Sequence, residues 1–157
     1  IKHKRAVLIF SLIAAIAVIC FIFAARGERL TNLENPQSSI AQRLDYWRTA
    51  INIIKDHPVL GVGPGNFQEV FLKYKVGLST DTRYAHNIFL HTWSEAGIIG
   101  FIAILSLIIA FLTKYKSENK YLFLAGLAFL LHNLVDNTYF IPEAGLLWWV
   151  LLGLVSI

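Results

Sequence analysis

Four long apolar runs constrain this chain more than any other feature of its sequence. The first run, residues 6–25, contains only two mildly polar residues, Ser11 and Cys20. A helix of about 20 residues matches a hydrocarbon core about 30 Å thick. The other three runs cover residues 96–112, 121–135 and 144–157. We therefore predict an all-α, polytopic transmembrane protein with about four membrane helices.

The composition supports this class and excludes others. Charged residues make up 15% of the chain, whereas soluble domains contain about 25%, and disordered chains are poor in apolar residues. A single cysteine, Cys20, excludes a disulfide scaffold and a cysteine-based zinc site. Basic residues lie at the ends of the apolar runs and form no patch interleaved with aromatic residues, so we expect no nucleic-acid partner.

The first run could alternatively be a signal peptide, because a basic segment precedes it. It is longer than the usual apolar segment of such a peptide, and the chain begins at Ile1 rather than at methionine. The chain also ends inside an apolar run. We therefore expect a fragment of a longer polytopic protein, with earlier helices missing.

Basic segments set the expected orientation, because positive charges favour the cytoplasmic side. Both residues 1–5 and residues 113–120 are basic, and two crossings separate them. We expect residues 1–25 to form a cytoplasmic basic end and a transmembrane helix. Residues 26–95 would form a large periplasmic or external loop with amphipathic helices. Residues 96–157 would form three further transmembrane segments, with a short cytoplasmic loop at residues 113–120.

Within the loop, the sequence predicts a helix from about Ser39 to Asp56. Ser39-x-x-Gln42 is a capping box, which satisfies N–H groups where a helix begins, and His57-Pro58 ends the helix. A stripe at helical spacing is expected to be buried and consists of Ile40, Leu44, Trp47, Ile51 and Ile54. A second short helix is expected over residues 66–75.

Two arginines lie at the margins of this stripe. Arg43 is about 60° from the centre of the stripe, and Arg48 lies on the opposite margin. Solvent-exposed surface arginines are the ordinary explanation. The planar guanidinium is also suited to bidentate binding of phosphate, so both residues are candidates for binding an anionic substrate.

The glycine-rich segment after this helix has two interpretations. Its glycines at positions 61, 63 and 65 permit a positive φ or a close approach of the backbone to another group. The segment is either a phosphate cradle, with Gly63 and Gly65 as binding residues, or a tight linker between two helices. A P-loop is excluded because no Gly-Lys-Ser/Thr follows.

Histidines with acidic neighbours precede the second apolar run and end the third. His86 would lie near a helix N-terminus, which favours the neutral imidazole that can accept a proton. His91 and Glu95 have i, i+4 spacing and could be only a structural pair. His132 and Asp136 have the same spacing and either pair structurally or contribute to function. The HExxH pattern is absent, so we expect no metal.

Four motifs follow one another between residues 40 and 140. They are Arg43-x3-Trp47-x2-Ala50, His57-Pro58-x2-Gly61-x-Gly63-x-Gly65-x-Phe67, His86-Asn87-x2-Leu90-x4-Glu95-x-Gly97-x2-Gly100 and His132-x3-Asp136. Together they resemble the O-antigen ligase and polymerase superfamily. Because the order and the spacing of several motifs agree, the resemblance is fairly specific.

The resemblance implies a multi-pass glycosyltransferase of the bacterial inner membrane that uses a polyprenyl-pyrophosphate-linked glycan. The acceptor would be lipid A–core in a ligase, a growing glycan in a polymerase, or pilin in related enzymes. It implies functional roles for Arg43 and His86. We interpret these as stabilisation of the pyrophosphate leaving group and general base catalysis. The family also uses arginines from more N-terminal segments, so part of the site would lie outside this chain.

The other candidate residues are expected to bind substrate, and no cofactor is expected. They are Arg48, Gly63, Gly65, Asn87, His132 and Asp136. A transporter of lipid-linked glycans is the alternative from a different class, but polar residues would then line the membrane helices. A membrane anchor with a binding loop is a third hypothesis.

Overall fold

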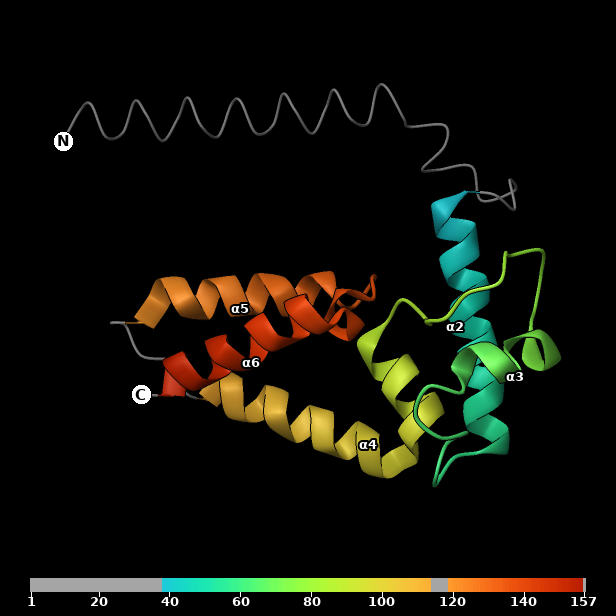
Figure 1. Cartoon of the computed structure of the whole chain (residues 1–157), viewed down its shortest axis with the longest axis horizontal. Helices are drawn as coiled ribbons and strands as arrows, with labels where there is room; N and C mark the ends of the chain where they lie inside the picture. Colours follow the sequence, from blue (N-terminus) through green and yellow to red (C-terminus); the bar gives the residue numbers. More distant parts are fainter. Residues whose placement is uncertain (1–37, 114–118, 157) are drawn as a thin grey trace. The chain divides into compact units, whose positions relative to one another are not determined.

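The computed structural model describes residues 38–113 and 119–156, which form five α-helices and one 3₁₀-helix and contain no strand (Figure 1). The prediction of an all-helical chain is therefore confirmed for these residues. The chain divides into two compact units, residues 1–41 and residues 42–157. The predicted membrane helix over residues 6–25 lies outside the described residues.

Helix α2 spans Ser39–Asp56, as predicted, but the predicted capping box is out of register by one residue. The Ala41 N–H donates to Ser38 Oγ at 3.2 Å, so Ser38 satisfies one of the N–H groups at the start of the helix. The side chain of Gln42 accepts hydrogen bonds from the hydroxyls of Tyr46 and Thr80.

The buried face of α2 differs from the predicted stripe, because Ile40 and Ile51 are exposed. The face that is buried consists of Tyr46, Thr49, Ala50 and Ile53. Phe67 and Phe71 share one core with this face. Tertiary packing, rather than the number of large apolar residues, therefore decides which face is buried. Arg43 lies about 20° from Ala50 around the helix, so it belongs to the packed side.

Helix α3 spans Phe67–Tyr74, close to the second predicted helix. Helix α4 spans Ile88–Thr113 and begins well before the second apolar run. Asn87 accounts for this early start, because its Oδ1 accepts hydrogen bonds from the N–H groups of Phe89 and Leu90, each at 3.0 Å. Gly97 interrupts α4 with a φ of 64° and marks a kink.

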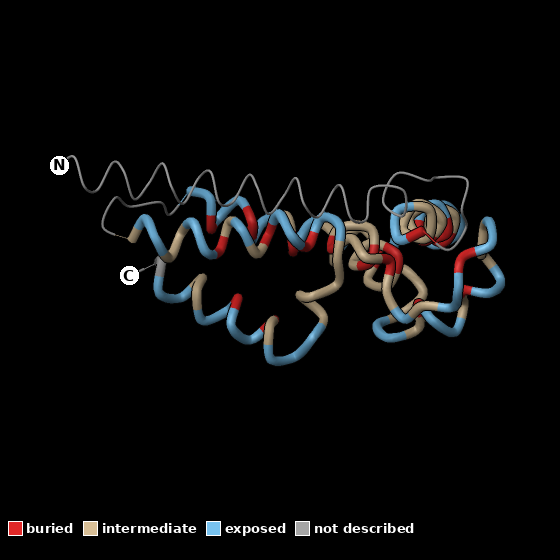
Figure 2. The backbone as a smooth tube through the Cα atoms, turned by 90° about the horizontal axis from the view of Figure 1, so that it is seen from above, coloured by how far each residue is buried: buried red, intermediate tan, exposed pale blue. Residues whose placement is uncertain are grey.

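Helix α4 is the one described helix that is long and apolar enough to cross a membrane. Helices α5 (Lys120–His132) and α6 (Pro142–Ser156) are apolar but shorter, and the 3₁₀-helix η2 (Thr138–Phe140) precedes α6. These helices share an apolar core that includes Phe111, Leu130 and Trp148. Their outward sides remain exposed (Figure 2), and many of the exposed residues are large and apolar.

Candidate functional site

The turn after α5 is fixed by three consecutive carbonyl groups, those of residues 133–135. In order, they accept hydrogen bonds from Ile88 N–H at 2.9 Å, Asn87 Nδ2 at 2.8 Å and Arg43 Nε at 2.7 Å. These contacts join the turn to α2 and to the first turn of α4. Asp136, the next residue, is thereby placed beside both helices.

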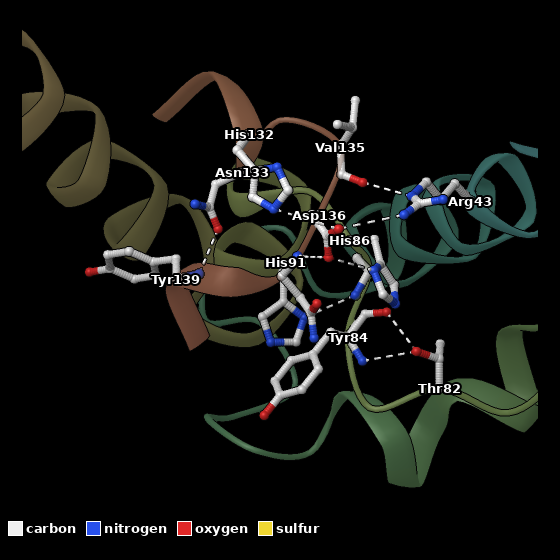
Figure 3. Close-up of polar contacts among 12 residues, drawn as sticks. Arg43, Thr82, Tyr84, His86, His91, His132, Asn133, Val135, Asp136 and Tyr139 are labelled. Carbon is white, nitrogen blue, oxygen red and sulfur yellow. Dashed lines mark hydrogen bonds and ion pairs between the residues drawn. The ribbon is translucent and has the colours of Figure 1, made fainter. Parts of the chain in front are cut away.

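Asp136 is the centre of a polar cluster (Figure 3). Its Oδ2 lies 3.5 Å from Arg43 Nη2 and 3.7 Å from His132 Nε2, and its Oδ1 lies 3.4 Å from His86 Nδ1. The Asn137 N–H donates to Oδ1 at 2.7 Å. We refer to Arg43, His86, His132 and Asp136 as the Asp136 cluster. The structure thus brings together four of the residues that the sequence suggested.

The carboxyl group of Asp136 is held in its charged form. Burial by itself raises the pKa of Asp136, but the Asn137 N–H and the positive charge of Arg43 outweigh this effect, and the two histidines act in the same direction. The net result is a pKa below the usual value. The cluster therefore contains one fixed carboxylate that faces one permanent cation.

His86 has a left-handed backbone, with a φ of 53°. This conformation costs an L-residue about 1–2 kcal/mol, and surrounding contacts must enforce it. Trp47 Nε1 donates to the His86 carbonyl at 3.3 Å, and the N–H of Ala85 donates to His91 Nδ1 at 3.4 Å. Such strained residues gather at functional sites, so the backbone at His86 is a further indication of function.

The ring of His86 stacks on Tyr46, with centroids 5.5 Å apart and an interplanar angle of 21°. Its Nδ1 is buried and has no hydrogen-bond partner among the described residues, since the contact with Asp136 lacks hydrogen-bond geometry. Burial lowers the pKa of His86, Arg43 lowers it further, and Asp136 opposes both. The net shift is downward, which favours the neutral imidazole, and its largest cause is burial rather than the helix dipole proposed from the sequence.

Two of the predicted binding residues have structural partners elsewhere. Arg48 Nη1 lies 3.5 Å from Asp45, and 64% of the Arg48 side chain is exposed. Asn87 stands next to His86, but its oxygen caps α4 and its nitrogen binds the Leu134 carbonyl. The structure gives neither residue a contact with the charged groups of the Asp136 cluster.

The glycine-rich segment packs against the kink of α4. Val62 N–H and Gly63 N–H donate to the carbonyls of Ser94 and Glu95, both at 2.9 Å. A Cβ added to Gly61 would collide with the backbone of Glu95 and would lie 2.7 Å from Gly97 N. This geometry favours the linker interpretation, because the N–H of Gly63, one of the two predicted cradle residues, already binds α4.

Gly65 has a positive φ of 81° but lies in open space, with nothing within 4 Å of an added Cβ. It therefore serves the local turn and has no close backbone neighbour. Gly63, by contrast, has a φ of 96°, and a Cβ added there would lie 2.8 Å from Asn66 Nδ2.

Sequence reasoning missed the groups that hold the cluster in place. Tyr46 supports the ring of His86, Trp47 binds its carbonyl, and the carbonyl of Val135 binds Arg43. Tyr46 and Trp47 follow Arg43 by about one helical turn, and this spacing is a usable signal. A backbone carbonyl such as that of Val135 leaves no signal in the sequence.

An apolar cavity of about 280 Å³ lies beside α4. Its walls include Ala96, Gly100 and Leu107 of α4, Tyr139 of η2 and Trp149 of α6. Within residues 38–113 and 119–156, no group of three or more His, Cys, Asp or Glu side chains is positioned to hold a metal ion.

A comparison with known protein families decides where the chain belongs. The family model described as O-antigen ligase matches residues 1–105. This chain belongs to the O-antigen ligase family. The family match contains Arg43, His86 and the glycine-rich segment, whereas His132 and Asp136 lie beyond it. The structure therefore adds the part of the cluster that the family match does not reach.

A relative of this O-antigen ligase family member occurs in Haemophilus influenzae and is described as an uncharacterized protein. It is 31% identical over 93 residues, which cover 55% of this chain and 23% of that protein. The chain thus matches about a quarter of the length of its relative. No solved structure matches the chain.

Proposed function

We propose that the chain is part of a membrane glycosyltransferase that moves a glycan from a polyprenyl-pyrophosphate donor to an acceptor hydroxyl. We favour an O-antigen ligase with lipid A–core as the acceptor. The observation that carries the proposal is that the Arg43 guanidinium and the His86 imidazole both contact the carboxylate of Asp136. Membership of the O-antigen ligase family supports it. Residues outside this chain would complete the site.

In the proposed reaction, the acceptor oxygen bonds to the anomeric carbon of the transferred sugar. The bond between that carbon and the pyrophosphate oxygen breaks, and its electron pair leaves with the pyrophosphate. The acceptor proton passes to His86. A proton on Nδ1 directed at Asp136 would leave Nε2 as the accepting atom. The contact of 3.4 Å is loose, as is common for catalytic hydrogen bonds without substrate.

Arg43 would stabilise the negative charge that develops on the leaving group. Its Nε is held by the Val135 carbonyl, and 31% of its side chain is exposed. A phosphate oxygen can therefore approach the guanidinium without displacing the whole side chain. His132, with 54% of its side chain exposed, would contact the same anion. We retain His132 and Asp136 as substrate-site residues and give Arg48, Gly63, Gly65 and Asn87 no direct contact.

We further propose that the chain lies in the bacterial inner membrane with residues 26–95 on the periplasmic side. Helix α4 supports a crossing by its length and composition. Soluble monomers rarely expose large continuous apolar surfaces, so the exposed apolar sides of α4, α5 and α6 support further membrane-embedded segments. The apolar cavity beside α4 fits part of a lipid tail.

The same geometry would serve an O-antigen polymerase or a pilin oligosaccharyltransferase, because these enzymes differ in the acceptor. The glycan phenotype of a strain that lacks the gene distinguishes the ligase from the polymerase. Loss of all attached long glycan indicates the ligase, whereas a single attached repeat unit indicates the polymerase.

The decisive experiment uses the purified full-length protein in liposomes with a labelled polyprenyl-pyrophosphate glycan. We expect release of polyprenyl pyrophosphate that depends on the acceptor and is matched by glycan on the acceptor. Movement of intact donor across the bilayer without cleavage would contradict the proposal and indicate a transporter. Donor that stays intact and does not move would leave a binding or anchoring role.

A further inference from the structure

A second histidine, His91, lies in the protein interior beneath the strained backbone of His86. We propose that His91 and Glu95 form a positioning pair that holds His86 in its left-handed conformation and sets its approach to Asp136. The pair would act through the Ala85 N–H and would not touch substrate. This inference rests on the proposed function, in which His86 accepts the proton of the acceptor.

Packing gives His91 one orientation. Its side chain is 2% exposed. The rings of Phe67, Tyr84 and Phe140 meet it edge-on, with centroid distances of 5.1, 5.3 and 4.3 Å. A ring enclosed in this way cannot turn without displacing its neighbours, so its two nitrogen atoms have fixed directions.

The hydrogen bonds of His91 define its tautomer. Nδ1 accepts the N–H of Ala85 at 3.4 Å, so Nδ1 carries no proton. The proton of the neutral ring therefore lies on Nε2, which faces Glu95 Oε2 at 3.5 Å. Ala85 is fully buried, and His91 is the acceptor that satisfies its N–H immediately before His86.

Glu95 connects this contact to two other segments. Its Oε1 accepts the N–H of Phe67, the first residue of α3, at 3.0 Å. Its carbonyl accepts the N–H of Gly63 at 2.9 Å. The pair thus lies where α4, α3 and the glycine-rich segment meet. Through the bond from the Ala85 N–H to His91 Nδ1, it fixes the backbone at His86 relative to that junction. Without the acceptor at Nδ1, the segment around Ala85 can relax and His86 can move away from Asp136.

Two amide substitutions separate this role from simple packing. In His91→Asn, the amide oxygen lies nearest the position of Nδ1 and can accept the Ala85 N–H. In His91→Gln, the amide lies nearest Nε2, so it keeps the contact with Glu95 and loses the one with Ala85. His57→Gln is the control, because His57 is exposed and contacts Tyr74 at 3.2 Å.

The experiment measures kcat, the donor KM and the melting temperature of the purified full-length variants. It also follows modification of His86 by diethyl pyrocarbonate with mass spectrometry. We expect His91→Asn to keep kcat within a few-fold of wild type. For His91→Gln we expect a loss of about 10- to 100-fold in kcat, little change in donor KM and faster modification of His86, because a misplacement of about 1 Å can cost about 100-fold.

Glu95→Gln provides an independent test should His91→Gln fail to fold. Because the Phe67 N–H needs the oxygen as its acceptor, the NH2 group of the glutamine would face His91 Nε2 and donate to it. This favours the other tautomer, in which Nδ1 carries the proton and no longer accepts from Ala85. We expect the same loss of kcat and the same faster modification of His86. A wild-type kcat together with a wild-type rate of His86 modification in Glu95→Gln would overturn the proposal. Equal kcat losses in His91→Asn and His91→Gln, with unchanged modification of His86, would also overturn it. If the wild-type protein transfers no glycan, the proposed function fails, while the modification rate still tests the positioning.

Discussion

The glycine-rich segment and the Asp136 cluster both suggested phosphate binding in the sequence, but their structures differ. In the glycine-rich segment, the N–H groups of Val62 and Gly63 bind the α4 backbone. In the Asp136 cluster, Arg43 and Asp136 stay partly exposed and His86 Nδ1 lacks a hydrogen-bond partner among the described residues. The comparison teaches that N–H groups bonded within the fold belong to the scaffold, whereas charged groups that stay partly exposed can still reach a ligand.

The largest expected effect comes from removing the proposed base. His86→Ala should lower turnover by about 10²–10⁴-fold, the usual contribution of general base catalysis. Binding of the lipid-linked donor should change much less, because the proton is transferred only as the sugar bond forms. Single-turnover transfer with preloaded donor, alongside a donor-binding assay, measures both quantities.

His86→Gln is the control for this prediction, since glutamine forms hydrogen bonds but cannot act as a base near neutral pH. We expect His86→Gln to be nearly as slow as His86→Ala. Near-wild-type turnover in His86→Gln would rule out the base role, although His86 could still contact the acceptor or the pyrophosphate.

A matched pair of arginine variants gives the next largest effect. Arg43→Lys should lower the transfer rate, because one ammonium cannot replace a guanidinium that binds Val135 and Asp136 at once. A charged hydrogen bond contributes about 1.5–3 kcal/mol, which corresponds to a loss of about 10- to 100-fold in rate. Arg48→Lys should transfer glycan at the wild-type rate, since the Arg48 side chain is 64% exposed and pairs with Asp45. The opposite ranking of the two variants in a transfer assay would show that Arg48, rather than Arg43, stabilises the leaving group.

Glycine variants test the scaffold side of the comparison through stability rather than rate. In Gly97→Ala, the new Cβ collides with the Val59 carbonyl, and the positive φ is also strained. We therefore expect the free energy of unfolding to fall by several kcal/mol, with about 1–2 kcal/mol from the strained φ and about 1–3 kcal/mol from overpacking. Gly65→Ala has the strained φ but open space and should lose only about 1–2 kcal/mol. Thermal unfolding of both variants measures the difference.

The donor KM of Gly65→Ala provides the functional side of the same test. We expect it to equal the wild-type value, because the linker interpretation gives Gly65 no phosphate contact. A large rise in KM in a variant that loses no more stability than expected would restore the phosphate-cradle interpretation.

The sequence predicted local features better than long-range ones. The bounds of α2 were predicted from a capping motif and from Pro58, which are local signals, and the structure reproduces them although Ser38 rather than Ser39 provides the cap. The buried face of α2 depends on Phe67 and Phe71, which are distant in sequence, and the apolar stripe did not reveal it.

The Asp136 cluster shows the same limit. Motifs identified Arg43, His86, His132 and Asp136 as separate candidates. Their assembly depends on three backbone carbonyls after α5, which accept hydrogen bonds whatever their side chains. Tertiary structure was therefore needed to show that the four residues form one polar cluster.

The dependence of kcat/KM on pH tests the central claim that Asp136 and Arg43 tune a neutral base at His86. Since the pKa of His86 is lowered, the rate should fall in acid with a midpoint below about 6.5, the usual imidazole value. Asp136 raises this pKa, so Asp136→Asn should move the midpoint to still lower pH. A midpoint that stays in place or moves upward in Asp136→Asn would contradict the account.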